Sequence, residues 1–344
     1  LNDFLNEDIT FNNKESFYDE IKSKIYSAIK IGTIADVEIG SFLSGGIDSS
    51  IITKLSANNS SNIKTFNISF DGKSEAEQSK LIANSVGTNH FSKKFENQEI
   101  SNYFETFIDV MDQPSFDGLN TFLVSKEASK HTKVSLSGLG ADEIFFGYEI
   151  INNFIKARKK KKFYDNFFST LYKTNPNRFF QRSFFNKIKI DDFFINLRAL
   201  NTEKYEIFFH RDFISSDDNF KMETDILKFD NQSENLYKRI FHFEIKNYLA
   251  NTLLRDSDNF SMSHSLEIRP LFLDHELIEF VSKTLNYSKN INHEPKHELK
   301  KIYNDNFQIK QNNKIGFEIP LYEIINKNLK DDVIERLSRK NDIF

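Results

Sequence analysis

The segment VEIGSFLSGGIDSS, residues 37–50, decides the fold. Val37 to Leu43 is a short apolar run, which predicts a strand buried on both faces of a parallel sheet. It ends in Ser44-Gly45-Gly46, and we expect a helix to begin near Asp48. Glycines allow close approach of the backbone, and a helix N-terminus binds phosphate well. A glycine turn with an Asp or Ser helix cap explains the segment equally well on these residues alone. It is not the ATPase loop that ends in Gly-Lys-Ser/Thr, because no lysine follows the glycines.

The same order of strand, glycine turn and helix recurs along the first half of the chain. Apolar spacing predicts helices over 14–30, from near Asp48, over 75–86 and near 119–130, and strands over Ile63–Phe70 and Val134–Leu136. This alternation predicts an α/β fold, a parallel sheet flanked by helices, with a helical C-terminal portion after about residue 150. We therefore divide the chain into a linker and leading helix (1–35), an α/β core (36–152) and a mostly helical part (153–344) that completes the same active site.

Composition excludes several classes of protein. The chain has 344 residues, with 46 Lys+Arg against 50 Asp+Glu, and a net charge of −4 argues against a nucleic-acid partner. We see no apolar run of membrane-spanning length and no signal peptide, so we expect no membrane partner and a cytoplasmic location. The absence of cysteine excludes thiolate metal sites and cysteine nucleophiles in this chain.

A second glycine loop, Ser137-Gly138-Leu139-Gly140-Ala141-Asp142-Glu143, also follows a predicted strand. In a parallel sheet both loops lie at the carboxyl edge, where open α/β sheets bind ligands. Asp48 and Asp142 could then face one site, and two carboxylates with phosphate oxygens suit Mg²⁺. The alternative is an acidic, solvated helix start.

Two further segments carry charged residues of interest. The run LLRDSDNFSM…LEIRPLFLD, residues 253–274, contains Glu267 and Arg269. Two residues apart, they would pair poorly on a helix, so we expect each to be positioned separately; routine ion pairs are the alternative. The other segment begins with Lys296 and includes Lys314-Ile315-Gly316-Phe317, although a lysine before glycine is commonly a solvated turn residue.

Together, these segments resemble the synthetase domain of the glutamine-dependent asparagine synthetase family. Five marks of that family occur in order over about residues 20–325, namely SGGIDSS, Asp112-Gln113-Pro114, SGLGADEIFFGY, the run from 253 to 274, and Lys314-Ile315-Gly316-Phe317. The resemblance implies an ATP pyrophosphatase fold, like that of the adenine nucleotide alpha hydrolases. It also implies a ligase that adenylates a carboxylate with ATP, transfers ammonia to it, and releases AMP and pyrophosphate.

The resemblance also implies a role for each matching residue. The pyrophosphate end of ATP would be held by Ser44, Gly45, Gly46, Asp48, Ser49 and Ser50. Phe42, Ile68, Ser137 and Gly138 would surround the adenosine and the α-phosphate. Asp48 and Asp142 would bind Mg²⁺, and Lys314 would stabilise charge developing around the α-phosphate. Glu267 and Arg269 are the remaining candidate catalytic residues.

Two departures from the family pattern bear on the substrates. Without a cysteine nucleophile, the N-terminal glutaminase domain is expected to be absent from this chain, so ammonia would come from such a domain or partner elsewhere. Leu139 stands where asparagine synthetases carry an acidic residue thought to act as a base near the incoming ammonia, and Asp117 is a candidate substitute.

A leucine at this position resembles relatives from surface-polysaccharide gene sets. The resemblance therefore implies a small-molecule carboxylate as acceptor, either aspartate or a sugar or other acid. A non-catalytic ATP-binding relative is the remaining alternative, and a homodimer is a candidate assembly.

Overall fold

The computed structural model of this protein describes most of the chain outside one long central segment. The described residues are 8–60, 62–70, 75–115, 118–149, 151–153, 155, 236–291, 294–311, 319, 324 and 330.

Five parallel strands form one sheet with the order β3-β2-β1-β4-β5. The strands are β1 Ile39–Phe42, β2 Lys64–Ser69, β3 Asn89–Lys94, β4 Val134–Ser137 and β5 Glu267–Pro270. The parallel α/β sheet predicted from the sequence is confirmed, and three of its strands fall where they were predicted. β1 lies between β2 and β4, so the chain order reverses beside it.

The two strands that the sequence did not predict are the edges of this sheet. β3 reads NHFSKK, and all of its residues are exposed or half-buried. β5 reads EIRP and has no fully buried residue. Because edge strands carry polar and charged residues, neither shows the apolar run that reveals β1. β5 also extends the sheet beyond the predicted 36–152 segment.

Helices cover both faces of the sheet. They are α1 Lys14–Gly32, α2 Ile47–Asn59, α3 Ala76–Val86, α4 Asn97–Asp109, α5 Gly118–Ala128, α6 Ala141–Ile144, α12 Leu236–Phe243, α13 Leu254–Met262, α14 His275–Ile291 and α15 His297–Asn306. A π-helix, η3 (Glu244–Leu253), joins α12 to α13, and a 3₁₀ turn, η4 (Leu271–Leu273), follows β5.

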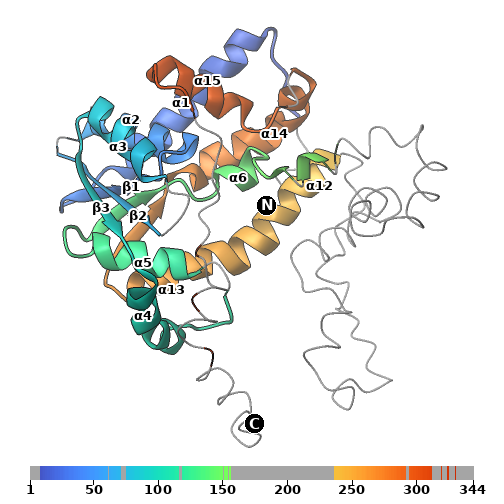
Figure 1. The fold of residues 1–344 in the computed structure, drawn as a ribbon. Coiled ribbons are helices and arrows are strands. Elements are labelled where there is room, and N and C mark those ends of the chain that lie inside the picture. Colours follow the sequence, from blue (N-terminus) through green and yellow to red (C-terminus); the bar gives the residue numbers. More distant parts are fainter. Residues whose placement is uncertain are drawn as a thin grey trace, which may run out of the picture.

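The helices divide between two hydrophobic cores. On one face α1, α2, α3, α14 and α15 gather over the sheet, and on the other lie α4, α5 and α13 (Figure 1). The predicted spacing of α1 is confirmed, since Phe17, Ile21, Ile25 and Ile29 are all buried. On the opposite face the ring of Phe260 stacks 4.8 Å from that of Phe107. None of the helices described is both long and apolar enough to cross a membrane.

Arg269 and Glu267 do not stand apart as expected. They lie on β5, where residues two apart share a face, and Arg269 Nε donates to Glu267 Oε1 at 2.7 Å. The expectation of separate placement was wrong because it assumed helical spacing. Arg269 Nη1 also donates to the carbonyls of Gly32 (3.0 Å) and Ile34 (2.7 Å), and so ties β5 to the connection between α1 and β1.

We expect Arg269→Ala to lower the free energy of unfolding by about 1–3 kcal/mol, because hydrogen bonds from charged donors are lost. Urea denaturation measures the change. Lys130→Ala, which removes an exposed ion pair with Glu127, is the control, with an expected loss under about 0.5 kcal/mol. Equal losses in the two variants would contradict the clamping role of Arg269.

Candidate active site

A cavity of about 650 Å³ opens at the carboxyl edge of the sheet, where β1 and β4 lie side by side. In open α/β sheets this switch of strand order leaves a crevice that binds ligands. The loops that follow β1 and β4 form two of its walls, and residues from β2, α3, α5 and the start of α15 complete it.

The loop after β1 is held open by glycine and serine. Gly45 has a φ of +87°, and a Cβ there would lie 2.8 Å from the Ser79 nitrogen. Gly46 N–H donates to Ser44 Oγ at 3.3 Å, and the hydroxyls of Ser44 and Ser49 lie 3.1 Å apart. α2 begins directly after Gly46, so its first N–H groups and the positive end of its dipole lie at the cavity. This arrangement suits an anionic phosphate.

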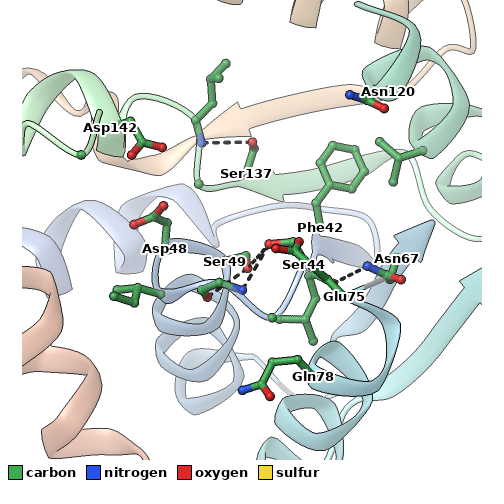
Figure 2. A pocket seen from close by; sticks show the side chains of 18 of the residues that line it. Phe42, Ser44, Asp48, Ser49, Asn67, Glu75, Gln78, Asn120, Ser137 and Asp142 are labelled. Atoms are coloured by element: carbon green, nitrogen blue, oxygen red, sulfur yellow. Dashed lines mark hydrogen bonds between the residues drawn. The ribbon is translucent and has the colours of Figure 1, made fainter. Parts of the chain in front are cut away.

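Asp48 and Asp142 meet at one end of the cavity, as predicted from the two loops (Figure 2). Lys296 Nζ lies 2.6 Å from Asp48 Oδ2 and 2.6 Å from Asp142 Oδ1. The loops themselves are in contact, since a Cβ on Gly138 would lie 3.0 Å from the Asp48 Cβ. The two carboxylates therefore converge on a single point that already carries a positive charge.

Lys296 reaches this point because of its place in the backbone. It precedes α15 in a left-handed conformation (φ 51°), and its N–H donates to the Phe145 carbonyl at 3.1 Å. Burial lowers the pKa of Lys296, but the charges of Asp48 and Asp142 outweigh that effect and hold the pKa above its ordinary value. The sequence singled out Lys296 without a role, because a lysine buried by tertiary packing has no local signal.

Gly147 lies against the side chains of Asp142 and Lys296. A Cβ on Gly147 would lie 1.8 Å from Asp142 Oδ1 and 2.3 Å from Lys296 Cε. Any larger residue would displace the carboxylate or the lysine. Position 147 therefore requires glycine, because its backbone lies directly against the charged side chains of Asp142 and Lys296.

The two carboxylates fit Mg²⁺ as part of a ligand set. Both present oxygen, the donor that magnesium prefers, and both already contact one cation. No group of three His, Cys, Asp or Glu side chains suited to a metal occurs among the residues that the structure describes. Asp48 and Asp142 would therefore hold the ion together with phosphate oxygens and water, as magnesium usually requires.

The other end of the cavity carries an aromatic ring and amide side chains. Phe42, Asn67 and Asn120 lie there, away from Asp48 and Asp142 (Figure 2). Ile68 and Val124 also line the cavity, and Asn67 Nδ2 donates to the Leu43 carbonyl at 3.2 Å. An aromatic ring and amide groups suit a heterocyclic base, whereas the opposite end suits its phosphates.

Most of the residues predicted for the site line this cavity. They are Phe42, Ser44, Gly45, Gly46, Asp48, Ser49, Ile68, Ser137, Gly138 and Asp142. Ser50 is fully buried and does not line it: Ser50 lies one helical turn into α2, where its N–H donates to the Gly46 carbonyl. Glu267 and Arg269 do not line it either: Glu267 pairs with Val134 at the start of β4, and the Arg269 guanidinium donates to the carbonyls of Gly32 and Ile34. Lys314 and Asp117 lie outside the described residues.

A buried acid that the sequence did not single out stands behind Asp142. Glu143 is 2% exposed and accepts a hydrogen bond from the Tyr148 hydroxyl. Burial raises the pKa of Glu143 to about 7, although the Tyr148 hydrogen bond opposes the shift. Glu143 and Tyr148 together fix the turn that carries Asp142 and Gly147.

Comparisons with known proteins agree with this fold. The sequence model of the asparagine synthase family matches residues 20–342. Asparagine synthetase [glutamine-hydrolyzing] 1 of Bacillus subtilis is 27% identical over 315 residues, covering 88% of this chain and 49% of the relative. Asparagine synthetase [glutamine-hydrolyzing] 3 of the same species is 26% identical over 284 residues (76% and 41%). The amidase chyE of Penicillium rubens is 28% identical over 156 residues (40% and 23%).

The parallel sheet and its carboxyl-edge cavity define an α/β protein of the ATP pyrophosphatase type. With a family match over almost its whole length, the chain belongs to the asparagine synthase family. It spans about half the length of the first of the curated relatives it matches.

We expect Lys296→Met to lower the free energy of unfolding by about 3–5 kcal/mol, because it leaves two facing carboxylates without their cation. Magnesium chloride should restore part of this loss, since a cation that binds only the folded state stabilises it. Thermal denaturation with and without magnesium measures both effects.

The matched control is Lys300→Met, which removes a lysine that lines the same cavity. If magnesium raises the melting temperature of Lys296→Met no more than that of Lys300→Met or the unmodified protein, Asp48 and Asp142 are not a cation site.

Proposed function

We propose that this protein is an ATP-dependent amide ligase that adenylates a carboxylate and transfers ammonia to it, with release of AMP and pyrophosphate. The observation that carries the proposal is the meeting of Asp48, Asp142 and Lys296 beside the glycine loop, in a chain of the asparagine synthase family. A scaffold that had lost catalysis would have no need to keep two carboxylates and a lysine buried together.

ATP would lie along the cavity, with its base between Phe42 and Ile68 and its pyrophosphate over the loop at 44–46. Ser49 and the first N–H groups of α2 would bind the phosphate oxygens. Magnesium bound to Asp48 and Asp142 would neutralise charge on the leaving pyrophosphate. These roles are proposed from the family resemblance and from the placement of the residues.

Lys296 is proposed as the fixed cation of the reaction. Its Nζ lies within 3 Å of both candidate metal carboxylates and is held in a buried position. Once these carboxylates bind magnesium, the ammonium would face the adjoining phosphates. A fixed donor aimed at charge that develops in the transition state is worth about 3 kcal/mol. Lys314 retains the role that its motif implies, as a second cation supplied from outside the described residues.

The acceptor and the nitrogen source are also proposals. Ammonia would reach the site from a glutaminase domain or partner, as the printed names of the glutamine-hydrolyzing relatives suggest. Aspartate is the acceptor that those names suggest. Leu139, which lines the cavity, favours instead a sugar or other carboxylate of surface-polysaccharide synthesis. A cytoplasmic location and a homodimer remain predictions from the sequence.

The experiment that tests this function is carboxylate-dependent exchange of labelled pyrophosphate into ATP. The protein is incubated with ATP and magnesium, together with aspartate, glutamate, glucuronate or galacturonate in turn. Exchange that depends on one of these acids supports adenylation and names the acceptor. ATP binding without exchange, with this panel and a wider one, would favour the non-catalytic alternative.

We expect Asp48→Asn and Asp142→Asn each to reduce this exchange by at least about 10²-fold, because each removes a charge from the proposed magnesium–phosphate site. Asp109→Asn, an exposed change on α4, should leave the rate unchanged. Circular dichroism shows whether each variant is folded. Near-normal exchange in either folded site variant would refute the metal assignment.

We expect Leu139→Glu to leave aspartate a poor acceptor, because we propose that the site has been adapted to another acid. Loss of general-base help alone would cost about 10²–10⁴-fold and would be recovered by the new carboxylate. Asparagine formation from aspartate and ammonium, measured by chromatography before and after the substitution, distinguishes the two explanations. A large gain with Leu139→Glu would contradict adaptation to another acid.

A further inference from the structure

Behind the glycine loop, four side chains form one chain of hydrogen bonds. Thr65 on β2 pairs with His90 on β3, and Thr65 Oγ1 lies 2.9 Å from His90 Nδ1 and 2.9 Å from Thr88 Oγ1. On the other side of the ring, His90 Nε2 lies 3.4 Å from Ser79 Oγ, in the first turn of α3. The His90 ring thus joins β2 and β3 to the helix that connects them.

The hydrogens in this chain have one arrangement when the ring is neutral. The Ser79 hydroxyl donates its single hydrogen to the Ala76 carbonyl at 2.9 Å, so it can only accept from His90 Nε2. His90 Nδ1 then carries no hydrogen and accepts from the Thr65 hydroxyl, which in turn accepts from Thr88. A neutral ring with its hydrogen on Nε2 therefore bonds through both of its nitrogens.

A charged ring fits this position less well. A second hydrogen, on Nδ1, would point at the Thr65 hydroxyl, and the Thr65–Thr88 pair would have to reverse. Burial lowers the pKa of His90, and the charge of Lys80 on α3 lowers it further. The groups that bond the ring from β2 and α3 are hydroxyls, and in the described part of the chain Lys80 is the charged group that acts on it. The fold therefore favours the neutral form.

Ser79 connects this ring to the glycine loop. Ser79 is fully buried, and its N–H donates to the Glu75 carbonyl at 2.9 Å. A Cβ on Gly45 would lie 2.8 Å from the Ser79 nitrogen and 2.9 Å from Gln78 Cγ, so the loop lies directly against this turn. Glu75 and Gln78 line the main cavity beside the loop (Figure 2). A shift in the first turn of α3 would therefore move the glycine loop.

We propose that His90 is a positioning residue, which acts through Ser79 to hold the glycine loop where it binds the phosphates of ATP. The neutral ring keeps the first turn of α3 against Gly45, and the loop loses this support when the ring takes up a proton. The inference rests on the proposed function, because ATP is the proposed ligand of the loop. His90 does not line the cavity, so it would control ATP affinity without touching the nucleotide.

The first test compares the pH dependence of ATP affinity in the unmodified protein and in His90→Gln, by titration calorimetry. Glutamine keeps a donor for Ser79 but does not titrate. Support from the neutral ring is complete above the ordinary histidine pKa of about 6.5 and is lost as the pH falls below it. The two proteins should therefore bind ATP alike at about pH 7.5, whereas at about pH 5.5 the unmodified protein should bind about fivefold more weakly than His90→Gln.

The ratio between the two proteins is the measured quantity, because ATP itself takes up a proton in this range. An equal pH dependence in the two proteins would overturn the inference.

The second test asks whether His90 acts through Ser79. At about pH 7.5, His90→Ala and Ser79→Ala should each weaken ATP binding by about fivefold, the factor that one hydrogen bond is worth. The double variant should bind no more weakly than either single variant, since all three lack the same contact. Losses that add would show that the two side chains act independently, which contradicts the proposal.

His131→Ala is the matched control. His131 is also half-buried, its ring stacks 4.0 Å from that of Phe91 on the same strand, and it does not line the cavity. The substitution should lower the melting temperature and leave ATP affinity unchanged. A loss of affinity equal to that of His90→Ala would mean that any weakening around β3 has this effect, and the inference would be wrong.

The same titrations separate this inference from the proposed function. If the unmodified protein does not bind ATP at about pH 7.5, the proposed function is wrong and the inference falls with it. If ATP binds but His90→Gln leaves the pH dependence unchanged, the inference alone is wrong.

Discussion

The structure of the site depends on the Lys296 ammonium held between Asp48 and Asp142. Two carboxylates that converge in a buried space repel one another, and each pays a desolvation cost that only a nearby cation can offset. The ammonium therefore determines how closely the loop after β1 can approach the loop after β4. Without that approach, the glycine loop and the two carboxylates would not belong to one cavity.

Two residues beside this charged group have backbone conformations that are unusual for residues other than glycine. Lys296 takes a left-handed conformation and Phe146 does as well, although neither is glycine. Each such residue costs about 1–3 kcal/mol and persists only where its surroundings demand it. Here the demand is visible: the Lys296 N–H bonds the Phe145 carbonyl, and the Phe146 ring lies 4.7 Å from the Lys289 ammonium. The turn that contains Phe146 leads from α6 to Gly147, which lies against Asp142 and Lys296.

Parallel topology made half of this site predictable from the sequence. Asp48 and Asp142 each follow an apolar strand and a glycine turn, and carboxyl ends of parallel strands meet at one edge. Lys296 could not be placed, since its burial arises from the packing of α15 against α2. The edge strands were missed because their residues are polar, and Glu267 and Arg269 were assigned to catalysis because their motif, not their geometry, singled them out. Ser50 matched the motif but does not line the cavity. It lies one helical turn into α2, where its N–H donates to the Gly46 carbonyl.

The two halves of the cavity are built by separate parts of the fold, and this separation bears on how substrates can change. The half beside the glycine loop comes from β1, β4 and the helices directly after them, which hydrophobic packing and the Lys296 ion pairs hold together. The half beside Leu139 comes from α5 and α13, which pack through buried residues such as Phe122 and Phe260, with an exposed ion pair, Arg255–Asp112, nearby. Surface ion pairs of this kind contribute little stability, so the exposed residues of such pairs can be exchanged at small cost. Exposed groups beside Leu139 can therefore change while Asp48, Asp142 and Lys296 stay in place, because the two carboxylates and the lysine do not depend on them.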